Sequence, residues 1–220
     1  MAERTLILVP CCLRKKPDDT DDTGDTPDYD RRFCITNYLS EGMAKKLMEL
    51  RRLVARNLEA GPDIGSETLQ ATQVRYMRAY ERYCGQLYSK ISRESWEKLN
   101  GHPDLSLIIV SALYGILRHD EFIRNYDRQM KDKIEGRQLK TWWRNKGLCD
   151  ILLDYVKRNK IEVVHDFLSE DYSEAIKPFQ SKIKELGLRY EYHKFGSEFG
   201  SGSNCYRGEE VNELIQTFPS

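Results

Sequence analysis

The sequence lacks any long hydrophobic run. No apolar stretch approaches the roughly 20 residues that a membrane-spanning helix needs. The start, "MAERTLILVPCC", has no basic segment ahead of an apolar core of the signal-peptide kind. Neither sign of charge is in excess, because 35 Lys and Arg balance 35 Asp and Glu. We therefore expect a cytoplasmic protein without membrane contact, whose overall charge does not by itself indicate a nucleic-acid partner.

Familiar nucleotide and hydrolase motifs are also absent. The chain has no P-loop, no G-x-G-x-x-G, no G-x-S-x-G and no H-E-x-x-H, which removes most support for a nucleoside triphosphatase or a zinc protease. Its six cysteines form no C-x-x-C pair and no zinc-type spacing with histidine. We expect free thiols, since a reducing compartment disfavours disulfides. We predict no cofactor and no metal site, and a structural metal is the less favoured alternative.

Four segments of the sequence predict β-strands. Three of them, at residues 5–10, 105–112 and 161–167, are short continuous runs rich in Leu and β-branched residues, typical of strands covered on both faces. The fourth, "LRYEYHKF" at residues 188–195, alternates in polarity. We therefore expect the first three strands inside a sheet and the fourth at its edge.

Segments with helical periodicity separate these strands. They lie at residues 36–61, 66–91, 138–160, 171–187 and 208–218. Strands that alternate with helices favour a layered α/β domain. We predict one domain over residues 1–220, with a central, mainly parallel or mixed sheet and helices on both faces. The helical block at about residues 38–100 is too long for a simple crossover, so we expect a helical lobe beside the sheet.

The segment "PDDTDDTGDTPDYD", at residues 17–30, is unusually acidic. It has seven Asp in fourteen residues and almost no hydrocarbon, which favours a solvated, mobile loop. A metal-binding loop is the alternative, although the spacing lacks the distal Glu of an EF-hand.

Polar residues follow three of the predicted strands, in "PCCLRKK", "SALYGILRHDEFIRNYD" and "HDFLSEDY". Ligands of α/β sheets collect at the carboxyl ends of the strands, so we expect these segments to form a binding site. The predicted substrate-binding residues are Cys12, Ser111, Tyr114, Gly115, Ser169, Asp171, Tyr172 and Arg207. Structural alternatives stay open: Cys12 can be a small core residue, and Ser169 and Asp171 can cap a helix.

A basic segment, residues 124–146, follows the second of these loops. It has eight Lys or Arg against three acids, with aromatic residues between them. Cations neutralise phosphates while aromatic rings stack on bases or wedge between them, so this composition favours DNA. The predicted DNA-binding residues are Lys15, Lys16, Arg124, Arg128, Lys131, Arg137, Lys140, Trp142, Trp143 and Arg144. A second Arg-Tyr stripe, residues 75–83, has helical spacing. Basic side chains on helices whose aromatics face the core are the alternative.

The segment "SALYGILRHDEFIRNYDRQM" resembles the signature of a family, that of the bacterial peroxide-stress protein YaaA and related YaaA-like domains. The resemblance rests on Ser111, Ala112, Leu113, Tyr114, Gly115, Leu117, Asp120, Ile123, Tyr126 and Met130. Weaker blocks occur in the same order at "LVPCCLRKK", "VVHDFLSEDYSEAI" and "YRGEEV", and the usual Asn ahead of the second block is replaced by "HDF". The resemblance implies an α/β core and an association with DNA, without implying a reaction.

The residues of this loop suit cleavage of an N-glycosidic bond. That reaction needs a carboxylate beside the sugar, donors for the departing base and aromatic walls. We therefore predict a DNA glycosylase that flips a modified base into a pocket, with Asp120, Asp127 and Tyr126 as the catalytic residues. Glucosylated hydroxymethylcytosine of phage DNA is our candidate substrate, by analogy with small base-excising defence enzymes.

Two other functions remain open. The chain can be a non-enzymatic, DNA-binding stress-response protein, which needs only the basic segment. It can also be a hydrolase of free modified nucleotides, which predicts no duplex affinity. In either case Asp120 and Asp127 can instead pair with neighbouring arginines.

Overall fold

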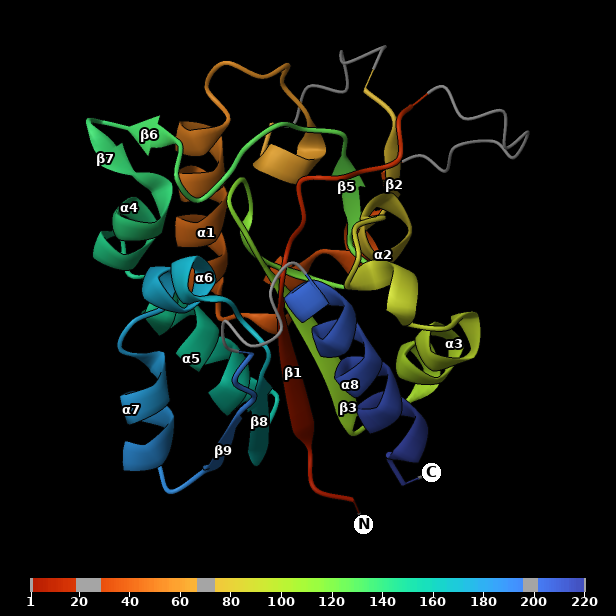
Figure 1. Cartoon of the computed structure of the whole chain (residues 1–220). Coiled ribbons are helices and arrows are strands. Elements are labelled where there is room, and N and C mark those ends of the chain that lie inside the picture. The colour runs from red at the N-terminus through yellow and green to blue at the C-terminus, as the bar shows by residue number, and fades with distance from the viewer. Residues whose placement is uncertain (1, 19–28, 67–73, 196–201, 220) are drawn as a thin grey trace.

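A five-stranded sheet forms the centre of the molecule (Figure 1). The computed structural model describes residues 2–18, 29–66, 74–195 and 202–219, and all structural statements refer to these. The strand order is β4 (Gly115–Arg118), β3 (Leu105–Ser111), β1 (Thr5–Pro10), β8 (Val163–Asp166) and β9 (Arg189–Tyr192). Strands β3, β1, β8 and β9 are mutually parallel, and β4 returns antiparallel to β3.

The strand pattern confirms the prediction from the sequence. Every residue of β1 is buried, as its continuous run of apolar side chains requires, and β1 lies at the centre of the sheet. Strand β9 lies at the edge, and three of its four residues are exposed. The mixed, mainly parallel α/β fold is therefore confirmed, while the single domain over residues 1–220 stays a prediction.

Helices cover both faces of the sheet (Figure 1). On one face, α5 (Leu148–Arg158) packs against α1 (Glu41–Val54) and α7 (Phe179–Glu185). On the other face, α3 (Arg93–Gly101) packs against α8 (Ser203–Thr217).

Short elements complete the fold around the carboxyl ends of the strands. They are η1 (Arg31–Phe33), η2 (Ile35–Tyr38), η3 (Pro62–Ile64), β2 (Tyr76–Arg78), α2 (Ala79–Arg82), η4 (Tyr88–Lys90), β5 (Phe122–Arg124), β6 (Lys133–Ile134), β7 (Arg137–Gln138), α4 (Leu139–Asn145) and α6 (Glu170–Ala175). Strand β2 pairs with β5, and β6 pairs with β7. In the described part of the chain, no helix combines the length and hydropathy that crossing a bilayer requires.

The region predicted as a helical lobe contains both helices and a strand, β2. Helices α1, α2 and α3 occur in it, but α1 and α3 pack with the helices on the two faces of the sheet. The prediction of a continuous helix over residues 66–91 was wrong at β2, because this segment pairs with β5. Most of the acidic segment, residues 19–28, lies outside the described residues.

Candidate functional site

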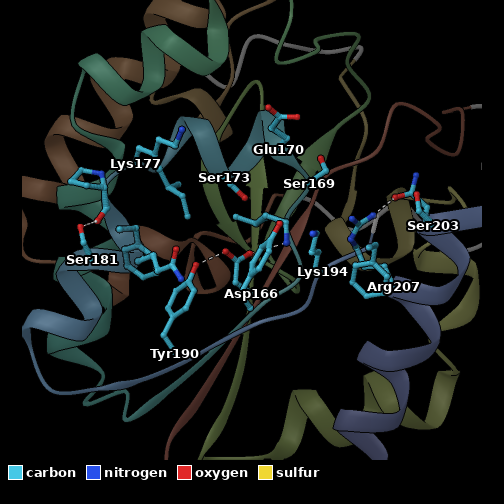
Figure 2. Close-up of a pocket in the computed structure, with 18 residues that line it drawn as sticks. Asp166, Ser169, Glu170, Ser173, Lys177, Ser181, Tyr190, Lys194, Ser203 and Arg207 are labelled. Carbon is cyan, nitrogen blue, oxygen red and sulfur yellow. Dashed lines mark hydrogen bonds between the residues drawn. The ribbon is translucent and has the colours of Figure 1, made fainter. Parts of the chain in front are cut away.

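A cavity of about 840 Å³ lies at the carboxyl ends of β8 and β9 (Figure 2). Its walls come from the start of α6, the segment that leads into α7, strand β9 and the first turns of α8. This is the edge of the sheet where parallel α/β proteins bind their ligands, and the volume suits a small molecule or one nucleotide unit.

Asp166, the last residue of β8, lines this cavity and is only 2% exposed. Its Oδ1 accepts a hydrogen bond of 2.8 Å from the backbone N–H of Leu168. Its Oδ2 accepts a hydrogen bond from the hydroxyl of Tyr190, as Figure 2 shows. Burial raises the pKa of Asp166, because the charged carboxylate loses water. The carboxyl group is thus held in one orientation and is more basic than an exposed aspartate.

Arg207 projects from the second turn of α8 to the opposite wall of the cavity (Figure 2). It is 4% exposed, and its Nη1 donates to Oδ1 of Asn204 at 2.6 Å. The guanidinium lies 4.6 Å from the ring centroid of Phe195. Its buried Nε has no hydrogen-bond partner among the described residues, and the same holds for Oγ of Ser173. Buried donors without partners are costly, so both atoms are suited to a ligand.

A second polar cluster lies beyond the ends of β1 and β3. The hydroxyl of Tyr126 lies 2.9 Å from Oγ of Ser111 and 2.6 Å from the hydroxyl of Tyr83. Nζ of Lys15 lies 3.9 Å from the centroid of the Tyr126 ring. Within the same cluster, Sγ of Cys11 lies 3.2 Å from the hydroxyl of Tyr172. These groups satisfy one another, which indicates a structural cluster.

The remaining predicted residues of this region also lack the features of reactive groups. Burial raises the pKa of Cys12 to about 12, so its thiol stays protonated at neutral pH and is a poor nucleophile. Burial likewise raises the pKa of Tyr126 well above its ordinary value. Asp127 is exposed, next to buried Tyr126. A catalytic role for Asp127 stays a prediction.

Asp120 lies away from the carboxyl edge of the sheet, and its catalytic role stays a prediction. Because β4 runs back along β3, Arg118 lies opposite Ile108, near the middle of β3. Asp120 comes two residues after Arg118 and accepts two hydrogen bonds of 2.9 Å from the Arg118 guanidinium. This ion pair holds the pKa of Asp120 below its usual value despite burial. The carboxylate is thus committed to an arginine away from the cavity.

Three predicted substrate-binding residues are inaccessible. Ser111 and Tyr114 are fully buried, and the Tyr114 hydroxyl donates to Oδ2 of Asp63 at 2.8 Å. Gly115 has a φ of +70°, and a Cβ there would lie 2.9 Å from the ring of Trp143. These residues therefore form the tight, buried turn from β3 to β4, and their binding role stays a prediction.

Three predicted DNA-binding residues are buried as well. Trp142 and Trp143 are 2% and 0% exposed, so neither can wedge into a base stack. Their indole N–H groups donate to Oε2 of Glu135 and to the carbonyl of Ala112. Arg124 is 3% exposed and pairs with a buried aspartate. For these three residues the alternative interpretation, aromatics facing the core and cations paired, is correct.

Other predicted residues take intermediate positions. Lys140 pairs with Asp171 at 2.5 Å, and Arg144 pairs with Glu174, so both cations join α4 to α6. Three predicted DNA-binding cations are exposed: Lys16, Lys131 and Arg137. Arg128 is half-buried, as is Lys15. Fewer predicted cations are thus exposed than the sequence suggests; Lys131 and Arg137 belong to the segment of β6 and β7, whereas Lys16 lies beside α2.

The structure brings two predicted residues together at the cavity, Ser169 and Arg207. The sequence analysis missed Asp166 and Tyr190. Asp166 ends a buried strand within the "VVHDFLSEDY" block, so the same rule about strand ends would have selected it. Tyr190 had no signal in the sequence, because its contact with Asp166 depends on the pairing of β9 with β8.

These features define a class, that of α/β proteins with a polar cavity at the carboxyl edge of a mainly parallel sheet. Within this class the chain belongs to the family described as peroxide stress protein YaaA, whose model matches residues 7–217. A UPF0246 protein of Rickettsia felis is 25% identical over 203 residues, covering 82% of this chain and 75% of the relative. A UPF0246 protein of Rickettsia conorii is 24% identical over 189 residues, covering 81% and 72%.

Proposed function

We propose that the protein hydrolyses an N-glycosidic bond of a nucleotide unit that enters the cavity beside β8 and β9. The observation that carries this proposal is Asp166, a buried and oriented carboxyl group of raised pKa in the cavity wall. Perturbed carboxyl groups in cavities are typical of acid–base catalysis. In this proposal Asp166 takes the catalytic role that the sequence assigned to Asp120.

The reaction follows from the groups around this carboxyl. Asp166 takes one proton from a water molecule as the water oxygen bonds to C1′ of the sugar. The bond from C1′ to the base nitrogen breaks, and the base leaves with the electron pair and takes a proton from solvent. The negative charge of Asp166 also stabilises the positive charge that develops on the sugar. Tyr190 and the Leu168 amide hold one lone pair on each carboxylate oxygen, so further lone pairs remain for the water.

The other walls suit the rest of a nucleotide. Arg207 and Lys194 supply positive charge for a phosphate, and Ser173 supplies a hydroxyl. Tyr192, half-exposed, supplies an aromatic face on which a base can stack. We propose DNA with a modified base as the substrate, bound through the exposed cations Lys16, Lys131 and Arg137. A bulky base such as glucosylated hydroxymethylcytosine suits the size and polarity of the cavity.

The test is an abasic-site assay on duplexes with plain and modified bases, using the full chain and two matched variants. Asp166→Asn is expected to reduce the rate by about 10²–10⁴-fold while DNA affinity and fold are retained. Asp127→Asn removes the other carboxylate that the sequence predicts as catalytic, and under the assignment to Asp166 it is expected to retain the rate. Loss of activity in Asp127→Asn alone would refute the assignment to Asp166.

Two outcomes separate the alternatives. Duplex binding without base release from any modified substrate favours a DNA-binding stress-response protein. That function needs only the exposed cations around β6 and β7. Base release from free modified nucleotides, without measurable affinity for duplex DNA, favours a nucleotide hydrolase. Folded protein that shows neither base release nor DNA binding refutes the proposal as a whole.

A further inference from the structure

Three side chains of types that can ligate metals meet on the face of the sheet opposite to Asp166. In the parallel pairing of β8 with β9, His165 lies directly opposite Glu191. Side chains alternate along a strand, so His193, two residues after Glu191, points to the same face. The sheet therefore places His165, Glu191 and His193 side by side, and we call them the His–Glu–His cluster.

The distances within this cluster fit one small cation. Nδ1 of His165 lies 3.0 Å from Nε2 of His193 and 3.4 Å from Oε2 of Glu191. All three ligand atoms lie within 4.8 Å of one another. Ligand atoms bound tetrahedrally to Zn²⁺ at 2.0–2.1 Å are separated by about 3.3 Å. The side chains are thus nearly at bonding positions without rearrangement of the backbone.

The surroundings of the cluster also resemble those of a metal site. The second nitrogen of His193, Nδ1, lies 3.2 Å from Oε2 of Glu210 on α8. A metal-binding histidine commonly donates its other N–H to a carboxylate, which fixes the ring and makes it a better ligand. The ring of His193 also stacks on Phe167, with centroids 3.9 Å apart.

We propose that the His–Glu–His cluster binds one Zn²⁺ ion, with Glu210 as an outer carboxylate. Two imidazoles and one carboxylate suit zinc, and three protein ligands leave a fourth position for water. This site is distinct from the cavity and does not depend on the proposed N-glycosidase. It also replaces the sequence prediction of no metal site, because residues 165, 191 and 193 meet only when β9 pairs with β8.

The position of the site suggests what the ion stabilises. Strand β9 is the edge of the sheet, and its backbone pairs with β8 and with no other described strand. Zinc would join β8 and β9 through their side chains and orient Glu210 of α8. Arg207 lies one turn before Glu210 on the same helix, so the ion would also fix the cavity wall that Arg207 forms.

The experiment is titration of the full chain with Zn²⁺ by calorimetry, and with Co²⁺ by absorption spectroscopy, under reducing conditions. We expect one ion per chain and a Co²⁺ spectrum without a thiolate charge-transfer band. Glu191→Gln and His193→Ala change partly exposed side chains at the edge strand and are expected to weaken binding by more than about 100-fold. Glu210→Gln is expected to weaken it by about 10–100-fold.

A control variant and three outcomes decide the proposal. His102→Ala removes a histidine that bonds the carbonyl of Pro219, away from the cluster, and should bind zinc as the unchanged protein does. The proposal is refuted if both Glu191→Gln and His193→Ala keep full affinity. It is also refuted by a thiolate band, which would place the ion on cysteines, and by the absence of binding at micromolar Zn²⁺.

Discussion

Arg124 gives the sharpest contrast between the sequence prediction and the structure. Its Nε and Nη2 donate to the two carboxylate oxygens of Asp63 at 2.8 and 2.7 Å. Asp63 is fully buried and also accepts from the hydroxyls of Tyr76 and Tyr114. Replacing Arg124 with Met keeps the hydrocarbon stem but leaves a buried carboxylate with two neutral donors.

The magnitude follows from the loss of the counter-charge. Removing one partner of a buried ion pair costs about 3–5 kcal/mol, because the other charge stays buried and unpaired. In a protein of this size, each kcal/mol lowers the melting temperature by about 2–4 °C, so Arg124→Met should melt about 6–20 °C lower. The double variant Asp63→Asn with Arg124→Met carries no unpaired charge, and we expect it to be more stable than Arg124→Met alone.

Urea unfolding, followed by fluorescence of the tryptophans, measures these differences. Lys131→Met is the matched control, since it changes an exposed cation of the same segment and should alter the free energy of unfolding by less than about 0.5 kcal/mol. The reasoning fails if Arg124→Met costs less than about 1 kcal/mol, or if the double variant is the less stable. Folded Arg124→Met should bind DNA as the unchanged protein does.

Four other expectations concern pH and salt. Burial lowers the pKa of His119 to about 4, so as the pH falls the unfolded chain takes up a proton at this residue before the folded chain does. The free energy of unfolding, measured by urea titration, should therefore drop by about 3 kcal/mol between pH 6.5 and 4. His119→Gln should not show this drop. The raised pKa of Asp166 should place the acid limb of the rate profile above the ordinary aspartate pKa of about 3.9, and a limb at or below that value would contradict its role as base. As the pH rises through this pKa, the protein should lose stability relative to Asp166→Asn, because ionising the buried carboxyl disfavours the folded state. Lys131→Ala with Arg137→Ala should reduce the slope of log affinity for duplex DNA against log salt by about 2, and an unchanged slope would place the DNA elsewhere.

The strands could be predicted from the sequence because burial on both faces leaves a local mark. Residues 6–10 are apolar without interruption and follow a β-branched Thr5, and the structure has β1 over Thr5–Pro10. Strand β2 could not be predicted in this way, because its three residues form a strand only by pairing with β5. The Arg-Tyr spacing there is compatible with a helix, and a tertiary contact decides against it.

The sequence could predict which edge of the sheet carries the candidate site, but not which residues form it. The rule about strand ends pointed to Ser169, whereas Arg207 came from the family resemblance, and both residues line the cavity. The same rule also pointed to Ser111 and Tyr114, which lie buried outside the cavity. A polar residue after a buried strand can also hydrogen-bond a neighbouring buried group, as Tyr114 does with Asp63. Composition alone also cannot show which face of α4 is buried, and this determines the burial of Trp142 and Trp143.

The central position of β1 has a consequence for synthesis of the chain. Strand β1 emerges first from the ribosome, yet its partners are β3 and β8, and β8 ends at residue 166. At about 5–20 residues per second, translation needs roughly 8–30 s to deliver β8 after β1. During that interval the apolar face that β1 presents in the finished sheet has no native cover. We therefore expect chaperones, or early packing of α1, to limit aggregation of the nascent chain during this interval.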